Sequence, residues 1–379
     1  MTDIHLLAGA AETALGSEAA LHEALGAGRS GAAPIRRFDA ARLVTPMAAC
    51  IDVPAEERRA GENLTQVLLR RVLNPLAVLP PAQAIIWAGV KGNAEFIESG
   101  RGLDCPYPYL PRHYSRWIRD VLGWPGAGLL EASAACASST LGLALGAGLI
   151  ASGRSRSVLV VAADIVSRFS AVGFSALNAL SPSVCRPFDA ARDGLILGDG
   201  AAACLLAGPD YVRESGRRPL ARITGWGVSN DANHITAPAR DGRGLSAAVR
   251  TALSLAGLAP DAVGAFCAHG TGTVYNDAME LTSIETVFGE RRFPVFSVKG
   301  ALGHTLGAAG CMETLICARV LEDGFIPPTT GFRTPEPRAI GRVSGERQRF
   351  EKGVVLKTNS GFGGVNVALI LERSDGGPT

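Results

Sequence analysis

The sequence predicts an α/β fold built from two similar halves. Segments of strand length that are almost entirely apolar alternate with helical segments, as expected for sheets covered on both faces. Hydrophobic residues make up 47% of the 379 residues and charged residues 19%, which favours a large buried core over disorder. Two stretches also repeat the same order of a strand end, a turn of small residues and a long apolar helix.

Strands and helices are assigned from apolar segments and their spacing. The expected strands are 158–166, 201–208, 265–270, 294–298, 353–360 and 366–372. The expected helices are 137–152, 246–256, 276–289 and 305–321. Residues 132–153 carry no charge and are long enough to cross a bilayer. They are rich in Ala, Gly and Ser and begin in a polar turn, so we predict a strand end and a fully buried helix instead.

The two similar stretches are EASAACASSTLGLALGAGLIASGR and FSVKGALGHTLGAAGCMETLICARVLEDG. A chemically reactive residue lies at the turn of each, Cys136 in the first and His304 in the second. This repetition predicts two halves that meet at one site.

The boundary between the halves is expected in the polar, turn-rich segment 208–220. We therefore predict an N-terminal half over residues 1–215 and a C-terminal half over residues 216–379. The segment 334–350 is rich in charge and is predicted to be a surface loop.

Charge and cysteine content exclude several classes of protein. The chain has 37 basic and 35 acidic residues, a balance that gives no indication of nucleic-acid binding. Its eight cysteines are scattered without zinc-type spacing, so we expect reduced, mostly buried thiols and a cytoplasmic protein. The N-terminus lacks a basic segment followed by a long apolar run, so no signal peptide is expected.

Cys136 lies where an apolar run turns into a predicted helix. The positive end of the helix dipole and the free backbone N–H groups would lower its pKa and favour the thiolate. Such a thiolate could accept an acyl group as a thioester. The alternative is a small buried cysteine packed among alanines.

His269 ends a predicted strand and opens a Gly/Thr loop, so its ring could donate an N–H to a carbonyl oxygen. Thr271 and Thr273 could bind an amide-rich ligand. Lys299, five residues before His304, would keep that imidazole neutral because two nearby cations repel. A neutral imidazole can stabilise a developing enolate. The alternatives are a strand-end histidine without function and a solvated lysine.

The Gly-rich loop from Asn359 to Asn366 could bring a backbone N–H close to a ligand, with Phe362 gating the pocket. The alternative is a plain hairpin turn. A second Gly-rich run, 192–200, lacks the pattern of a phosphate-binding loop.

Taken together, these motifs resemble the β-ketoacyl-acyl-carrier-protein synthases of the thiolase-like superfamily, in particular the elongating Cys-His-His type. The stretches that carry the resemblance are SAACASS, RPFDAARDGLILGDGAA, HGTGTVYNDAMELTSI, SVKGALGHTLGAAG and GFGGVNVALILE. The resemblance implies a thiolase-like fold, in which the two halves form a five-layered αβαβα core. In relatives, the region before the nucleophile adds part of the pocket cap and of the dimer surface.

The resemblance also implies a role for single residues. Cys136 would be the acylated nucleophile, and His269 and His304 would support decarboxylation and hold the enolate. Lys299 would orient this cluster. The backbone N–H groups of Cys136 and Phe362 would form the oxyanion hole. The remaining implied positions are the supporting carboxylates Glu280 and Glu313, the phosphopantetheine contacts Thr271 and Thr273, and the pocket aromatic Phe174.

The chain departs from the family's pattern at two residues. One gating phenylalanine is absent, and Ser360 takes its place. Asn178 stands where relatives often carry a basic residue for the acidic carrier protein. Other candidates for carrier docking are the arginines at 58, 59, 70, 71, 112, 116 and 119.

The implied function is a decarboxylative Claisen condensation between an acyl group on Cys136 and malonyl-acyl-carrier protein, in fatty-acid or polyketide-type biosynthesis. The reaction needs no metal and no cofactor beyond the carrier's phosphopantetheine. We expect an acyl-carrier protein as partner, a homodimer or a heterodimer with a related chain, and no nucleic acid or membrane span. Two alternatives are a non-elongating, chain-length-factor-like partner subunit and an acyltransferase to an oxygen or nitrogen nucleophile.

Overall fold

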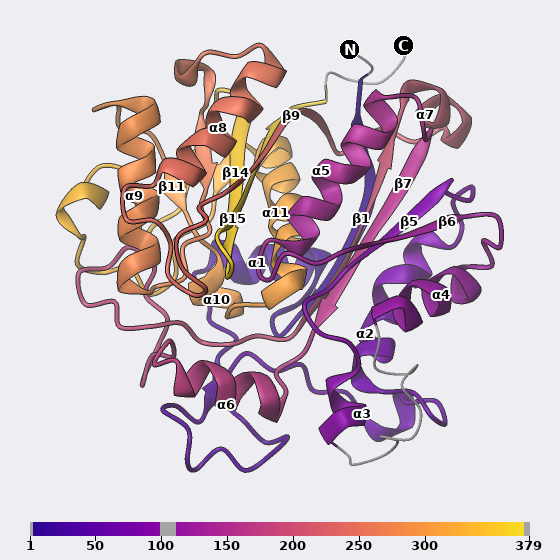
Figure 1. The fold of residues 1–379 in the computed structure, drawn as a ribbon, viewed down its shortest axis with the longest axis horizontal. Helices are drawn as coiled ribbons and strands as arrows, with labels where there is room; N and C mark the ends of the chain where they lie inside the picture. Colours follow the sequence, from indigo (N-terminus) through magenta and orange to yellow (C-terminus); the bar gives the residue numbers. More distant parts are fainter. Residues whose placement is uncertain (1–2, 99–110, 375–379) are drawn as a thin grey trace.

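The computed structural model describes residues 3–98 and 111–374 of the chain (Figure 1). Its strands fall into two sets of five with the same topology. The first set is β1 (His5–Thr13), β5 (Ala84–Ala88), β6 (Gly128–Ala132), β7 (Ser157–Asp164) and β8 (Gly200–Ala207). The second set is β9 (Ala221–Asn230), β10 (Ala265–Cys267), β11 (Val295–Phe296), β14 (Val354–Gly361) and β15 (Val365–Glu372).

The order of strands is β6-β5-β7-β8-β1 in the first set and β11-β10-β14-β15-β9 in the second. In each set three neighbouring strands are parallel and the last two run antiparallel to their neighbours. The sets join through a short antiparallel pairing of β1 with β9, at Leu6 opposite Ala221 and His5 opposite Arg222. The predicted repetition of two α/β halves is therefore confirmed.

The helices complete five layers. They are α1 (Glu18–Gly26), α2 (Leu64–Leu73), α3 (Ala94–Glu98), α4 (Pro111–Leu122), α5 (Ser138–Ala151), α6 (Arg168–Ala176), α7 (Pro209–Ser215), α8 (Arg243–Ala256), α9 (Val274–Phe288), α10 (Lys299–Leu302) and α11 (Ala309–Asp323). Both α5 and α11 contact strands of both halves and form the central layer. On the outside, α2 and α4 cover the first sheet and α8 and α9 the second (Figure 1).

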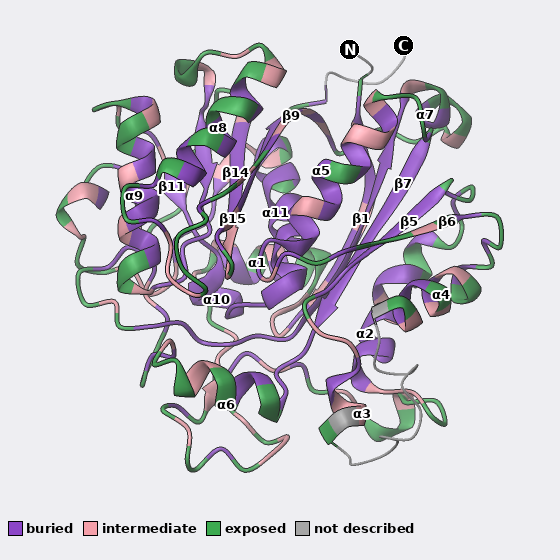
Figure 2. Cartoon of the chain, viewed as in Figure 1, coloured by how far each residue is buried: buried purple, intermediate pink, exposed green. Residues whose placement is uncertain are grey.

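Short strands complete the secondary structure: β2 (Gly16–Ser17), β3 (Ala33–Pro34), β4 (Met47–Ala48), β12 (Phe325–Ile326) and β13 (Gln348–Arg349). The core follows the layers. One apolar cluster lies between the two sheets around α5 and α11, a second lies under α2 and α4, and a third under α8 and α9. Figure 2 shows most strands of both sheets buried along most of their length, whereas in the edge strand β6 only Ala132 is buried.

The sequence explains the central layer. Every residue of β7 and of β8 is buried, in agreement with the continuous apolar runs that predicted them. Helix α5 packs between two sheets and is apolar on nearly all sides, although Leu145 is 47% exposed, so the expectation of a fully buried helix is not met at that position. Among the described residues, no helix combines the length and apolar character that crossing a membrane requires.

Two connecting segments contain more structure than the sequence predicts. The junction 208–220 contains the helix α7, which begins at Pro209, a residue favoured in the first turn of a helix. The segment 334–350 is not a simple surface loop, because Arg342 is 1% exposed. Its guanidinium donates to the carbonyl oxygens of Gly289 and Arg291, which directly follow the C-terminus of α9.

Candidate active site

Cys136 lies in the turn between β6 and α5 and is only 6% exposed. The preceding Ala135 has φ of +48°, a left-handed conformation that costs energy for a residue with a Cβ. Ser138 stabilises this turn, because its hydroxyl donates to the Ala135 carbonyl at 2.6 Å and accepts from the Ala134 N–H at 2.9 Å. The strained turn places Cys136 in the wall of a cavity of about 340 Å³.

The cavity brings together the three residues that the sequence motifs singled out. The sulfur of Cys136 and one ring nitrogen each of His269 and His304 lie within 4.8 Å of one another. The two imidazole rings meet edge to face, with centroids 5.2 Å apart. A thiolate and two neutral imidazoles are also a donor set that suits a soft divalent cation such as zinc.

The two halves hold His304 jointly. It follows α10 in the second half, and its backbone N–H donates to the carbonyl of Ile196 in the first half at 2.6 Å. Its own carbonyl accepts from the N–H of Gly198 at 3.0 Å. These backbone bonds fix His304 relative to Cys136 without a side-chain contact.

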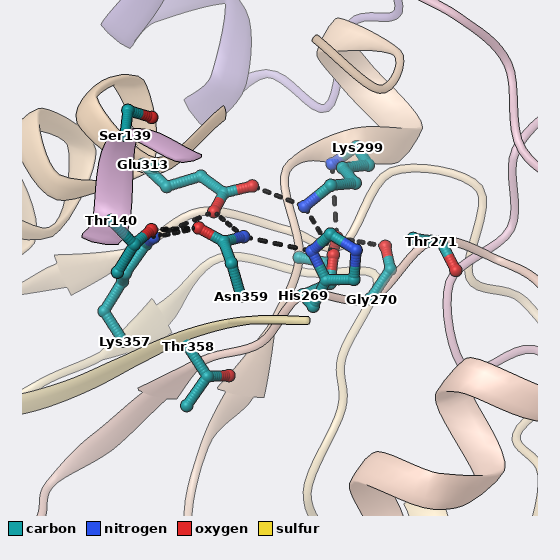
Figure 3. A network of polar contacts seen from close by, with 12 residues as sticks. Ser139, Thr140, His269, Gly270, Thr271, Lys299, Glu313, Lys357, Thr358 and Asn359 are labelled. Atoms are coloured by element: carbon teal, nitrogen blue, oxygen red, sulfur yellow. Dashed lines mark hydrogen bonds and ion pairs between the residues drawn. The ribbon is translucent and has the colours of Figure 1, made fainter. Parts of the chain in front are cut away.

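Lys299 and Glu313 form a buried ion pair beside His269. The Lys299 ammonium donates at 2.5 Å both to Glu313 and to the backbone carbonyl of His269 (Figure 3). Lys299 is 1% exposed, so the alternative of a solvated surface lysine is wrong. Its charge lies against the backbone of His269, and it fixes the position of that residue.

Glu280 supports the loop after β10 through the backbone. Its two carboxylate oxygens accept from the N–H of His269 at 2.7 Å and from that of Gly270 at 2.6 Å. Asp277, which the sequence motifs did not single out, accepts in the same way from the N–H groups of Thr271 and Gly272. The loop thus receives its shape from two buried carboxylates of α9.

A second buried cluster lies behind His269 on β14. Asn359 donates to His269 Nδ1 at 3.0 Å and to Glu313 at 2.8 Å, and its oxygen accepts from Lys357 and Thr140 (Figure 3). Sequence analysis did not single out Lys357 or Thr140. A signal was present, because a lysine within the apolar run of β14 that shares a face with Asn359 is rarely buried without a partner.

Burial dominates the electrostatics of the site. It lowers the pKa of both His269 and His304 well below the usual value, and the charge of Lys299 lowers both further. Both imidazoles are therefore neutral, as expected. Burial also raises the pKa of Cys136 to about 12, although Lys299 opposes this shift. The expectation of a lowered cysteine pKa is wrong, because loss of hydration outweighs the local field of the helix.

The remaining residues of the cavity lie where the motifs placed them. Thr271 and Thr273 line it, with hydroxyl oxygens 2.8 Å apart. Phe362, in the turn between β14 and β15, stacks on Phe174 of α6 with centroids 5.7 Å apart. Ser360 also lines the cavity, and its hydroxyl donates to Asn366 at 2.7 Å.

The turn that carries Phe362 lies directly against the turn that carries Cys136. A Cβ on Gly361 would come within 2.4 Å of the carbonyl oxygen of Ala134, so only glycine fits there. This contact brings the backbones of the two residues expected to form an oxyanion hole into one region.

The arginines considered for carrier docking differ in their surroundings. Arg70 is paired with Glu62, and Arg71 with Glu12 and Glu57. Arg58 lies 4.0 Å from Glu95, Arg119 pairs with its neighbour Asp120, and Arg59, Arg112 and Arg116 are exposed. Asn178 is exposed at the rim of the cavity.

Comparison with known proteins places this geometry in a family. Residues 119–209 match the family model described as the N-terminal domain of β-ketoacyl synthase, and residues 220–333 match its C-terminal domain. The ketoacyl synthase alpha subunit of the tetracenomycin polyketide synthase of Streptomyces glaucescens is 31% identical over 94% of this chain and 93% of its own length. The chain belongs to the β-ketoacyl synthase family.

Other β-ketoacyl synthases match over part of their length. The 3-oxoacyl-[acyl-carrier-protein] synthase 2 of Rhizobium meliloti is 37% identical over 56% of this chain, and nodulation protein E of Rhizobium leguminosarum bv. trifolii is 35% identical over 64%. The chain spans only 52% and 60% of the lengths of these two relatives.

The fold is shared along the whole chain. A β-ketoacyl synthase from Burkholderia phymatum has a TM-score of 0.88 at 26% identity, covering 99% of this chain and 100% of its own. A chain of the ishigamide ketosynthase/chain length factor has a TM-score of 0.87 at 29% identity, with the same coverage. The predicted thiolase-like ketosynthase fold is confirmed.

Proposed function

We propose that this β-ketoacyl synthase condenses an acyl group held on Cys136 with malonyl-acyl-carrier protein, releasing carbon dioxide and forming β-ketoacyl-acyl-carrier protein. The observation that carries the proposal is the convergence of one thiol and two neutral imidazoles within 4.8 Å in a buried cavity. The similarity to the S. glaucescens ketoacyl synthase subunit along nearly the whole chain supports it.

The first step transfers an acyl group from the carrier thioester to Cys136. Because the thiol is protonated at neutral pH, its proton must leave as the sulfur attacks the carbonyl. Within the described residues, the buried Nδ1 of His304 has no hydrogen-bond partner, whereas Nδ1 of His269 is occupied by Asn359. We infer that His304 accepts the thiol proton and passes it to the departing phosphopantetheine thiolate.

In the second step, the malonyl thioester loses carbon dioxide and its carbonyl becomes an enolate. N–H groups of His269 and His304 stabilise this charge in a site from which water is largely excluded. The enolate carbon attacks the acyl carbonyl on Cys136, and backbone N–H groups of Cys136 and Phe362 hold the resulting oxyanion. Collapse of this intermediate releases the Cys136 thiolate, which takes up a proton from solvent because its original proton left with the first carrier's thiol. The chemistry requires no metal or redox cofactor.

Phosphopantetheine binding is assigned to Thr271 and Thr273, which line the cavity that leads to Cys136. Phe174 and Phe362 are assigned as the gate, with Ser360 beside them. Glu280, Glu313 and Lys299 hold the two histidine loops. We further infer that the division into halves falls between residues 215 and 216, near the end of α7.

The partners are proposed to be an acyl-carrier protein and a second ketosynthase-like chain. Among the described strands, β6 is at the edge of its sheet, and its Leu130 is 44% exposed next to the buried Cys136 turn. An open strand edge with an exposed leucine favours pairing with another chain. Similar solved structures include a ketosynthase in complex with its chain length factor, which supports a heterodimer as well as a homodimer. The seven cysteines among the described residues are free, which fits a reducing, cytoplasmic setting.

Intact-protein mass spectrometry tests the function. The chain is incubated with acyl-carrier proteins bearing different acyl groups, and a mass increase equal to the acyl group is expected on the wild type but not on Cys136→Ala. Release of carbon dioxide from malonyl-acyl-carrier protein should follow. Acylation without decarboxylation would instead indicate transfer to an oxygen or nitrogen nucleophile. If Cys136 is not acylated, either in the chain alone or together with a partner chain, the result would indicate a non-elongating subunit.

A further inference from the structure

Asn359 uses its whole hydrogen-bonding capacity behind the site. Its amide nitrogen donates to His269 Nδ1 at 3.0 Å and to Glu313 Oε2 at 2.8 Å. Its oxygen accepts from the ammonium of Lys357 and the hydroxyl of Thr140. All of these residues except His269, which is 3% exposed, are at most 2% exposed, so water does not compete for these bonds (Figure 3).

The charges around Asn359 determine which way its amide points. A flip of the amide would place its oxygen against the carboxylate of Glu313 and its NH₂ group against the ammonium of Lys357. Both contacts would be repulsive in a site of low dielectric constant. The amide nitrogen must therefore face His269.

This orientation determines the tautomer of His269. Because Nδ1 accepts a hydrogen bond, a neutral imidazole must carry its proton on Nε2. Nδ1 is engaged behind the ring, so Nε2 is the nitrogen left to serve the cavity that His269 lines. An N–H donor is what an enolate oxygen requires.

Lys357 is a buried lysine in the same cluster as Asn359. It lies in β14, is 0% exposed, and its Nζ donates to Thr140 at 2.5 Å as well as to Asn359. The carboxylate of Glu313 lies 3.6 Å from Lys357 and already pairs with Lys299 at 2.5 Å. A lysine is costly to bury, and this one shares a single carboxylate with another lysine.

We propose that Lys357 and Asn359 are positioning residues that hold His269 as the Nε2–H tautomer, with Lys357 fixing the amide orientation of Asn359. The catalytic consequence rests on the proposed function, whereas the tautomer does not. Other titratable groups near His269 are Cys136, Lys299, Glu313, Glu280 and His304.

Nuclear magnetic resonance of the full chain with ¹⁵N-labelled histidine rings tests the proposal. The His269 signals, assigned by comparison with His269→Gln, should show the proton on Nε2 in the wild type. Asn359→Asp replaces the donor with an acceptor, so the proton should move to Nδ1. Lys357→Met leaves only Glu313 to orient the amide and should give a minor population with the proton on Nδ1 beside the wild-type tautomer. The matched control is Lys352→Met. Lys352 is exposed and lies two residues before β14, so this variant should resemble the wild type.

Kinetics give an independent measure. With the donor lost, Asn359→Asp should lower the rate of malonyl decarboxylation by ~10²–10³-fold, while acylation of Cys136 changes by less than about tenfold because His304 accepts the thiol proton. A proton on Nδ1 in the wild type, or an unchanged tautomer in folded Asn359→Asp, would overturn the proposal. An unchanged tautomer in Lys357→Met would overturn the part assigned to Lys357. If the tautomers are as expected but the wild type does not decarboxylate malonyl-acyl-carrier protein, the proposed function would be refuted and the proposal about the tautomer would stand.

Discussion

A Cβ placed on Gly310 of α11 would lie 2.3 Å from the backbone nitrogen of Thr140 of α5. The two central helices thus touch backbone to backbone near the N-terminus of each, close to the turns that carry Cys136 and His304. This contact connects the packing of the halves to the geometry of the site.

Gly310→Ala is therefore expected to lower the free energy of unfolding by at least ~1–3 kcal/mol, as overpacking does. Condensation should fall as well, since the helices must separate. Gly148→Ala in α5 is the matched control, because its added Cβ meets no described atom within 4 Å. It should leave stability unchanged or raise it by up to ~1 kcal/mol. Denaturant unfolding measures the free energy of unfolding of both variants. An equal loss of stability in Gly310→Ala and Gly148→Ala would argue against the close contact.

The neutral imidazoles predict the pH dependence of decarboxylation. The pKa of both His269 and His304 lies well below 6.5, so the N–H donors persist as pH falls and the rate should show no break near pH 6.5. Burial raises the pKa of Glu280 to about 7, and a Glu280→Gln variant shows whether that group contributes a break of its own. A decarboxylation rate that falls by half near pH 6.5 in both the wild type and Glu280→Gln would contradict neutral histidines.

The same histidines also affect stability. Below about pH 6.5 the unfolded chain binds protons on these residues and the folded chain does not. Their contribution to folding stability is therefore present above that pH and is lost as pH falls towards the folded-state values. Melting temperatures of His269→Gln against wild type, measured from pH 7 to 5, check the sign, since the variant should lose less on acidification.

The stack of Phe362 on Phe174 is expected to keep water from acyl-Cys136. Phe362→Ala should increase hydrolysis of the acyl enzyme by about tenfold or more relative to condensation, because an open site admits water. The control is Phe169→Ala, which should behave as wild type, because Phe169 lies on α6 like Phe174 but is 71% exposed. Loss of the acyl adduct over time is followed by mass spectrometry. Equal rates of hydrolysis in the two variants would show that Phe362 does not act as the gate.

Zinc is expected to inhibit the enzyme by binding Cys136, His269 and His304 together. The thiol must lose its proton to bind, so inhibition should strengthen as pH rises. Chelation should restore activity, and a Cys136→Ala chain should lose measurable zinc affinity by calorimetry. Inhibition that weakens with rising pH would exclude this site.

The sequence was sufficient for the elements whose signals are local. The apolar runs of β7 and β8 and the small-residue turns before α5 and α11 appear in the structure close to their expected ranges. Cys136, His269, Lys299 and His304 were found because each lies in its own short motif.

Other features depend on contacts between distant segments and were missed for that reason. Lys357 and Thr140 are separated by 217 positions and meet only when β14 packs against α5. The pKa of Cys136 was misjudged because a helix terminus is visible in the sequence, whereas burial by several surrounding elements is not. The sequence alone suggests a loop cation at Arg342, because the carbonyl oxygens of Gly289 and Arg291 that it binds lie 53 and 51 positions away.

The joining of the two sheets through β1 and β9 has a consequence for how the enzyme opens. The two halves share a short strand pairing, and their central helices meet backbone to backbone, so rotation of one half against the other would break both contacts. A long substrate would then enter past Phe174 and the turn after β14, both of which line the cavity. Selectivity would then reside in a few side chains at the entrance, which can be exchanged without disturbing the rest of the molecule.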